Sequence, residues 1–169
     1  MKPAIHVLPT VEEIKSRFNY NPETGVVTNK TTKVRKVAAG RIAGCMGDSG
    51  YLMVGINRRL YRVHRVAWAL YYGEWPTNFI DHINGVRSDN RIANLRQATK
   101  SQNSYNSAKR SDNTHGHKGV YLCKKSGRWY VRVNSKNIGR FIHKDDAIAA
   151  RDAAAQELHG EFYCAGNRK

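Results

Sequence analysis

The chain has 169 residues, with 29 Lys and Arg against 13 Asp and Glu, which gives a formal net charge of +16. A composition of 40% hydrophobic and 25% charged residues is typical of one globular domain or two small ones, and excludes a disordered chain. No apolar run approaches the roughly 20 residues of a membrane span, and the N-terminus lacks a signal-peptide pattern, so we expect an intracellular protein without a membrane partner.

The excess positive charge is spread along the chain. Residues 1–100 carry 16 basic and 7 acidic side chains, and residues 101–169 carry 13 and 6. This distribution excludes a simple basic tail, and no Trp-rich or Leu-rich helix face indicates a membrane surface. We therefore expect the protein to bind a phosphate backbone. A basic protein with no nucleic-acid role is the alternative.

The cysteines Cys45, Cys123 and Cys164 are odd in number and widely spaced, and none forms a C-x-x-C pair. This pattern argues against a disulfide framework and against a zinc-binding cluster. We expect reduced thiols and no structural zinc.

Local patterns in the first third of the chain predict a helix and two hairpins. Apolar residues at helical spacing predict a helix from Val11 to Phe18, with Thr10 as its N-cap and Glu13 as the reciprocal capping partner. Turn residues between strand formers predict hairpins within residues 20–27 and 51–63.

A second helix is predicted from Arg65 to Tyr72, because Gly73 is a suitable stop. The polar stretch 106–117 is the best candidate for a linker. Beyond it, the pattern predicts a small β-β-β-α unit, with strands at 119–124, 128–134 and 137–141 and a helix at 144–159.

The most informative segment follows the second helix. Asp81 and His82 are adjacent on a predicted strand, so their side chains point to opposite sides. Thr99 and Gln102 form a second capping box, which places Asn103 in the first turns of another helix. The predicted order is strand, long loop, short strand and helix.

At these spacings, Asp81-His82, Asn94 and Asn103 resemble the ββα-metal motif of HNH endonucleases, in the phage and intron-encoded, homing-like branch where Asn replaces the final His. The resemblance covers about residues 79–106, and residues 51–76 resemble the segment that precedes the motif in this branch. It implies a DNA endonuclease from a phage or mobile element, acting in the cytoplasm of a bacterial host.

Phosphodiester hydrolysis needs an activated water and a cation that neutralises the phosphoryl oxygens. A neutral histidine can accept the proton of water near pH 7, and carboxylate and amide oxygens suit Mg²⁺, with Mn²⁺ as an alternative. The resemblance therefore implies that His82 is the catalytic general base and that Asn94 is a catalytic brace across the loop. It also implies that Asp81 and Asn103 are metal ligands.

The alternative for these residues is a local role, because Asp and Asn commonly stabilise turns through backbone hydrogen bonds. We adopt this interpretation for Asn84 and Asn90. For His64, we favour a buried core position beside Trp68 over a phosphate contact.

The C-terminal region separates its charges. Residues 118–144 carry eight basic and no acidic side chains, whereas the predicted helix is mainly acidic, so we expect the sheet to face a polyanion. Period-two alternation assigns to one face of the second strand Arg128, Tyr130, Arg132 and Asn134. It assigns to the core face Trp129, Val131 and Val133. The helix is expected to pack through a stripe formed by Ala147, Ala150, Ala154 and Leu158.

Residues 116–163 resemble the plant Apetala-two or ethylene-response-factor DNA-binding domain. The resemblance lies in Lys118-Gly119-Val120, Gly127-Arg128-Trp129, Ile138-Gly139-Arg140-Phe141 and residues 147–160. It implies a sheet that enters the major groove, with DNA contacts from Lys118, Tyr121, Arg128, Tyr130, Arg132, Asn134 and Arg140. Several base-reading arginines of the plant domain are replaced here, so the target sequence does not carry over. A solvated basic sheet is the alternative.

We thus predict an α+β protein in which a ββα-metal HNH nuclease domain is joined to a three-stranded antiparallel sheet with one helix. The expected domains are residues 1–106 for the nuclease, 107–115 for the linker and 116–169 for the DNA-binding domain. The expected activity is the nicking of one strand of double-stranded DNA by a monomer. The alternatives are a sequence-specific DNA-binding regulator with an inactive HNH scaffold and a structural nucleic-acid-binding protein.

Overall fold

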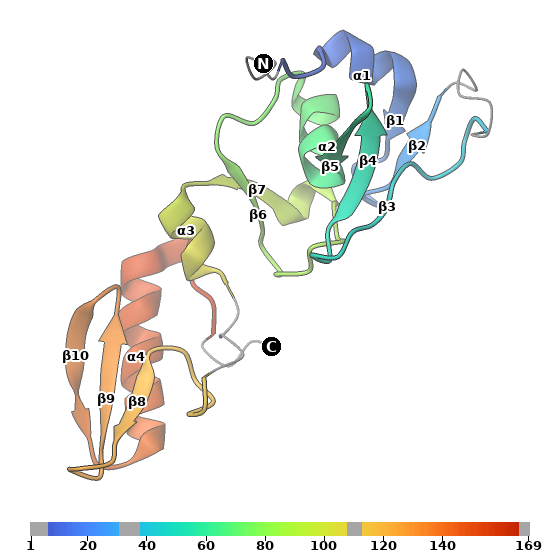
Figure 1. The fold of residues 1–169 in the computed structure, drawn as a ribbon. Helices are drawn as coiled ribbons and strands as arrows, with labels where there is room; N and C mark the ends of the chain where they lie inside the picture. The colour runs from blue at the N-terminus through green and yellow to red at the C-terminus, as the bar shows by residue number, and fades with distance from the viewer. Residues whose placement is uncertain (1–6, 31–37, 108–112, 166–169) are drawn as a thin grey trace, which may run out of the picture. The chain divides into compact units, whose positions relative to one another are not determined.

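The computed structural model describes residues 7–30, 38–107 and 113–165. They form two compact units, Met1–Ala98 and Thr99–Lys169 (Figure 1). All paired strands in the described residues are antiparallel, and helices accompany the sheets in both units. The predicted α+β class is confirmed. No helix in the described part of the chain is both long and apolar enough to cross a membrane.

The first unit begins with α1 (Val11–Arg17), whose capping box joins Thr10 and Glu13 as predicted. The hairpin of β1 (Phe18–Tyr20) and β2 (Val27–Asn29) follows directly. Because α1 and β1 are contiguous, their apolar residues enter the same core.

A three-stranded sheet comes next, with β4 at its centre. Its strands are β3 (Cys45–Met46), β4 (Leu52–Ile56) and β5 (Arg59–Arg62). The turn between β4 and β5 uses Asn57 and Arg58 at φ 51° and 62°, which is the backbone of a tight two-residue hairpin. The second predicted hairpin is therefore confirmed.

The central helix α2 (Val63–Tyr72) begins directly after β5 and ends at Gly73, which has a left-handed conformation. Six of its residues are buried, so this helix forms the middle of the core. A further antiparallel pair follows α2, formed by β6 (Phe79–His82) and β7 (Leu95–Ala98), with a long loop and the short 3₁₀ helix η1 (Ile92–Asn94) between them.

The second unit begins with α3 (Lys100–Tyr105), which has the predicted capping box. Its sheet has the order β10-β9-β8, formed by β8 (Val120–Cys123), β9 (Arg128–Val133) and β10 (Lys136–Phe141). The helix α4 (Lys144–His159) and the 3₁₀ helix η2 (Gly160–Phe162) complete it. The predicted β-β-β-α order is confirmed, and α4 covers one face of the sheet (Figure 1).

The packing of α4 differs from the predicted stripe. The buried residues of this helix are Ala147, Arg151 and Ala155, whereas Leu158 is exposed. Spacing of four residues places these three on one face, and the core that receives Ala147 also contains Val120 and Val131. The predicted burial of Ala147 is confirmed, but the rest of the stripe differs because the alanine-rich sequence leaves several faces of similar hydrophobicity, and only packing against the sheet selects among them.

The boundary between the two compact units falls between Ala98 and Thr99 in the sequence, eight residues before the predicted end of the nuclease domain. The reason is that α3 packs against η2 within the second unit. Most of the predicted linker lies outside the described residues, so its character stays a prediction.

Candidate active site and DNA-binding surface

The loop between β6 and β7 is fastened by Asn94. Its side-chain oxygen accepts from the Asn84 backbone N–H at 2.9 Å, and its amide nitrogen donates to the Asp89 carbonyl at 2.8 Å. The backbone N–H of Ile83 also donates to the Asn94 carbonyl at 2.9 Å. These bonds hold both ends of the loop, as expected of a bracing residue.

A second set of bonds tightens the outer part of the loop. Asn84 donates to the Asp89 carboxylate at 2.7 Å, and Arg91 pairs with the same carboxylate at 2.6 Å. The Arg91 guanidinium lowers the pKa of Asp89 to about 2. Asn84 therefore serves the loop, in agreement with the local role predicted for it.

His82 is the last residue of β6 and is only 4% exposed. Its Nε2 lies 3.3 Å from the side-chain oxygen of Asn90. Because an amide oxygen can only accept, this contact is a hydrogen bond when Nε2 carries the proton, and Nδ1 is then the nitrogen that can accept one. Burial lowers the pKa of His82, which favours the neutral ring that a general base requires.

Asn90 has a larger role than predicted. It is 1% exposed and contacts His82, whereas the sequence pattern indicated only a turn residue. The β1–β2 hairpin holds it from the other side, because the Tyr20 hydroxyl donates to the Asn90 carbonyl at 2.7 Å. Gly25 in the same hairpin approaches so closely that a Cβ there would lie 2.6 Å from the Asn90 carbonyl carbon. Only the contact between distant segments reveals this role.

Asp81 lies beside Arg96 across the hairpin, in the register that pairs β6 with β7. One oxygen of the Asp81 carboxylate accepts from the Arg96 guanidinium, with both N–O distances at 2.9 Å. Both side chains are largely buried. The arginine neutralises the carboxylate and fixes its orientation.

The HNH resemblance implies a divalent metal ion at this site. In residues 7–30, 38–107 and 113–165, no group of three or more His, Cys, Asp and Glu side chains is placed to hold a metal ion. A carboxylate and an amide oxygen match the donors that Mg²⁺ accepts when it retains several waters. Asp81 is such a carboxylate, so the donor chemistry fits the implied ion.

An aromatic and cationic cluster adjoins His82. The rings of Tyr51 and His64 lie 5.9 and 5.0 Å from the His82 ring, measured between centroids. The guanidinium groups of Arg62 and Arg87 lie 4.4 and 5.1 Å from the Tyr51 centroid. Cations at this distance are attracted to the face of the ring. The cluster thus places two positive charges close to the candidate base.

The predicted burial of His64 is confirmed, but its neighbours were not foreseen. It contacts Tyr51 and His82, which makes it part of the site rather than a remote core residue. Burial lowers the pKa of His64 to about 3. Sequence reasoning missed Tyr51, Arg62 and Arg87 because no local pattern places them next to His82.

Asn103 lies on α3 and is partly buried. The structure therefore brings together Asp81, His82 and Asn94 within the first unit, whereas Asn103 belongs to the second unit. Its assignment as a metal ligand stays a prediction.

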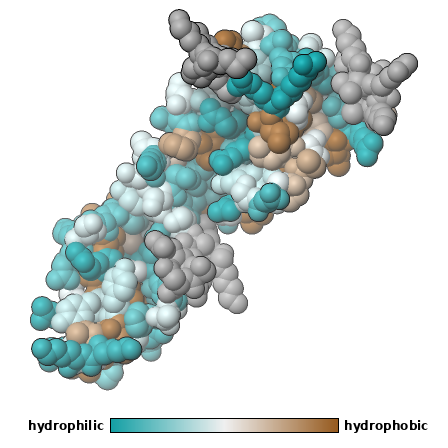
Figure 2. Space-filling view, viewed as in Figure 1, coloured by the Kyte–Doolittle hydropathy of each residue, from teal (hydrophilic) through white to brown (hydrophobic). Residues whose placement is uncertain are grey.

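The outer face of the β8–β10 sheet carries most of the predicted DNA contacts. Arg128, Arg132 and Arg140 are exposed, and Tyr121 is 48% exposed. The Arg140 guanidinium lies 5.0 Å from the centroid of the Tyr130 ring, on the neighbouring strand. Hydrophilic residues cover much of this face, which is turned toward the viewer in Figure 2.

The opposite face is the core, as the alternation predicted. Val131 and Val133 are buried, and Trp129 packs partly buried against the second core. Asn134 departs from the prediction, because β9 ends at Val133 and Asn134 lies in the turn that leads to β10. Asn134 and Ser135 have φ of 48° and 64°. These positive values form a tight two-residue hairpin turn and are incompatible with a β-strand.

Lys118 makes contacts within the second unit that the sequence did not predict. Its ammonium donates to backbone carbonyl groups at the end of α3, including Ser104 at 2.9 Å. Lys118 is partly buried, and its contact with DNA stays a prediction.

Comparison with known proteins agrees with the class of site described above. The HNH endonuclease family model matches residues 61–105, which include β6, the loop, β7 and α3. Protein 3.8 of Escherichia phage T7 is 30% identical over 105 residues, which cover 60% of this chain and 87% of that protein. The chain belongs to the HNH endonuclease family.

A solved structure described as "DNA binding and cleavage by the HNH homing endonuclease I-HmuI" is also similar. The match covers 89% of this chain and 90% of that chain, with 15% sequence identity and a TM-score of 0.42.

Proposed function

We propose that the protein is a metal-dependent endonuclease that nicks one strand of double-stranded DNA. The observation that carries this proposal is the buried His82, which has a lowered pKa and lies beside Asp81, at the start of a loop braced by Asn94. An HNH endonuclease domain with these residues in place has the parts that phosphodiester hydrolysis requires.

In this mechanism, Nδ1 of His82 accepts a proton from the attacking water. Asn90 keeps the proton on Nε2 and fixes the plane of the ring. Arg62 and Arg87, held beside Tyr51, attract the phosphodiester to the candidate base. Asn94 preserves the loop on which this arrangement depends.

Asp81 and Asn103 would hold a divalent metal ion, Mg²⁺ or Mn²⁺. When bound, this ion supplies charge neutralisation for the phosphoryl oxygen and the departing 3′ oxygen. Arg96 holds the Asp81 carboxylate in a fixed orientation. His64 keeps the ring of His82 in place through an edge contact.

The second unit would hold the duplex through the outer face of its sheet, in the manner of an Apetala-two-type domain. Arg128, Arg132 and Arg140 supply charge, and Tyr121 and Tyr130 supply contact surface. Lys118 and Asn134 were also expected here, but the environment of Lys118 favours another role. The protein would act inside the cell, in the bacterial cytoplasm if a phage encodes it.

A monomer is favoured because one Asp-His-Asn-Asn set cleaves one phosphodiester at a time, and a net charge of +16 opposes self-association. A double-strand break would require two sites related by symmetry.

The alternative function is a DNA-binding regulator with an inactive HNH scaffold. The interlocked bonds around His82 favour the nuclease, because a scaffold for binding alone has no chemical need for a buried neutral base.

The test is incubation of supercoiled plasmid with the wild type and the His82→Ala variant, with and without Mg²⁺. We expect open-circular product only from the wild type with metal. Activity that persists in EDTA, or equal activity of the variant, would contradict the proposed site. A duplex with separately labelled strands then tests nicking. Cleavage of both labels at the lowest enzyme concentration, with no nicked intermediate, would contradict the monomeric mechanism.

A further inference from the structure

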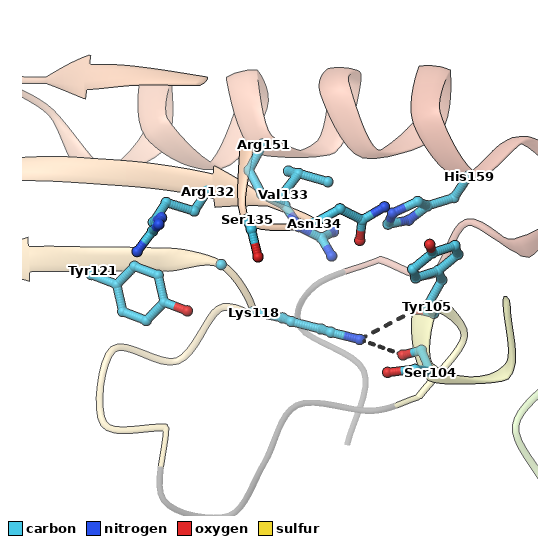
Figure 3. A pocket seen from close by; sticks show the side chains of 11 residues that line it. Ser104, Tyr105, Lys118, Tyr121, Arg132, Val133, Asn134, Ser135, Arg151 and His159 are labelled. Carbon is cyan, nitrogen blue, oxygen red and sulfur yellow. Dashed lines mark hydrogen bonds between the residues drawn. The ribbon is translucent and has the colours of Figure 1, made fainter. Parts of the chain in front are cut away.

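The ammonium group of Lys118 binds the C-terminal end of α3 through hydrogen bonds (Figure 3). The Lys118 Nζ donates to the carbonyl groups of Ser104, Tyr105 and Ser107 at 2.9, 3.3 and 3.2 Å, and it lies 3.1 Å from the Ser107 hydroxyl. The last carbonyl groups of a helix have no partner within the helix and carry partial negative charge. Lys118 therefore caps α3 from the residue pair that precedes β8.

An aromatic contact also holds the end of α3. The ring of Tyr105 stacks on His159, with centroids 4.0 Å apart and ring planes 5° from parallel. His159 is the last residue of α4, so this contact joins the end of α3 to the end of the long helix. Lys118, Tyr105 and His159 together line a pocket of about 320 Å³ (Figure 3). The short helix α3 is thereby attached to both β8 and α4.

The surroundings of Lys118 are unlike those of a phosphate-binding lysine. Its three ammonium protons already face four oxygen atoms, and burial lowers the pKa of the group. A phosphate could recruit this ammonium only after these bonds had broken. Lys124, on the turn at the far end of β8, is exposed by contrast.

We propose that Lys118 is a positioning residue that, with the Tyr105–His159 stack, fixes α3 and its Asn103 to the DNA-holding sheet. The inference rests on the proposed role of Asn103 as a metal ligand. Its consequence is that the placement of Asn103 depends on Lys118. Loss of Lys118 should therefore impair the use of metal rather than the attraction of DNA.

The experiment compares Lys118→Met with Lys124→Met, because both remove one positive charge from the same end of the chain. Four quantities are measured on the full-length protein: kcat, the Mg²⁺ concentration for half-maximal cleavage, the salt dependence of DNA affinity, and hydrogen exchange of the α3 amides. For Lys118→Met, we expect about a tenfold rise in the half-maximal Mg²⁺ concentration, a lower kcat and faster exchange at Asn103 and Asn106. The salt dependence should match the wild type.

The Lys124→Met variant should keep the metal dependence and the α3 exchange of the wild type. The Lys118→Arg variant, which can still reach the carbonyl groups, should restore most of the metal response. The proposal would be overturned if Lys118→Met left the metal response unchanged and reduced the slope of log affinity against log salt by about 0.9. That result would indicate that Lys118 had contacted a phosphate. Unchanged exchange in α3 would also overturn the proposal.

The exchange measurement separates this inference from the proposed function. A wild type that fails to cleave under any metal condition would refute the nuclease, and with it the role of Asn103. Exchange in the absence of metal and DNA would still decide whether Lys118 fastens α3. If Lys118→Met fails to fold, Tyr105→Leu provides the same comparison through the stacked pair.

Discussion

The β6–β7 loop in the first unit and the β8–β10 sheet in the second place their polar side chains in opposite environments. Asp81, His82 and Asn94 are buried, and each has a specific partner within the first unit. The arginines on the outer face of the sheet are exposed. The contrast follows from what each region would do, because chemistry depends on fixed geometry whereas attraction to a polyanion depends mainly on charge.

This comparison has a consequence for mutations. Changes in the loop should affect turnover and stability, because the side chains are interlocked. Changes on the sheet should affect DNA affinity and leave folding almost unaltered, because exposed side chains contribute little to stability.

The first prediction concerns His82→Ala. Turnover should fall by about 10² to 10⁴-fold, because general-base catalysis typically contributes this factor. DNA affinity should remain close to that of the wild type, since the exposed charges lie elsewhere. Single-turnover cleavage and a binding titration in Ca²⁺ measure the two effects, with the exposed His143 changed to Ala as the control. A parallel loss of affinity and turnover would break the division.

The second prediction concerns Gly25→Ala. A side chain at φ +74° costs about 1–2 kcal/mol, and its Cβ would lie 2.5 Å from the Arg91 nitrogen. The forced shift of packed backbone should add about 1–3 kcal/mol, so the free energy of unfolding should fall by about 2–5 kcal/mol. Turnover should also fall, because the shift displaces Asn90.

The matched control for this change is Gly40→Ala. Gly40 has φ +80°, but nothing lies within 4 Å of its added Cβ. It should therefore lose only the conformational part, about 1–2 kcal/mol, and keep its activity. Urea unfolding and plasmid nicking measure both variants. Equal losses would show that the hairpin does not support the loop.

The third prediction concerns acid stability. Burial lowers the pKa of His64 from 6.5 to about 3, so the folded state holds a neutral ring while the unfolded chain binds a proton below about pH 6.5. The unfolded state thus takes up more protons as the pH falls. The free energy of unfolding should decrease by up to about 1.4 kcal/mol per pH unit between these values through this group.

Urea unfolding at pH 6.5, 5.5 and 4.5 measures this dependence. The His64→Gln variant should show a shallower decline than the wild type, whereas His143→Gln should not. If His64→Gln follows the wild-type slope, the buried ring is not the source of the acid sensitivity.

The fourth prediction concerns Arg132→Ala. It should weaken DNA binding by about 1–3 kcal/mol if the arginine contacts a base, with no measurable change in folding. Arg151 is an unsuitable control, because it is 2% exposed and donates to Asp152 and to the Cys164 carbonyl. Lys15→Ala removes the same charge from an exposed position on α1. Equal losses of DNA affinity in the two variants would show that Arg132 contributes only nonspecific charge.

Some features of α4 could be predicted from the sequence and others could not. The acidic helix was located correctly, from Lys144 to His159, because an alanine-rich segment bounded by Gly160 carries its own end signal. The burial of Arg151 on this helix was not predicted. Its guanidinium donates a hydrogen bond to the carbonyl group of Cys164, which lies 13 residues away in the sequence. Burial of an arginine is unusual unless a partner is available, and the partner lies outside any local window.

The candidate site shows the same limit. The order of strand, loop, strand and helix, together with the spacing of Asp81, His82, Asn94 and Asn103, was sufficient to identify the motif. Asn90 was assigned to a turn, because its hydrogen bond to His82 depends on how the loop folds back. The approach of Arg62 and Arg87 to Tyr51 likewise joins residues from three separate segments.

Sequence patterns alone are sufficient to predict the capping boxes at Thr10 and Thr99, the hairpin turns and the family of the nuclease motif. These features depend on residues within a few positions of one another, where side-chain chemistry and backbone geometry are coupled directly. The contact of Asn90 with His82 and the bonds from Lys118 to the end of α3 become visible only in the folded structure. Such contacts form between segments that come together during folding, so their partners are selected by packing and by the need to satisfy buried polar groups.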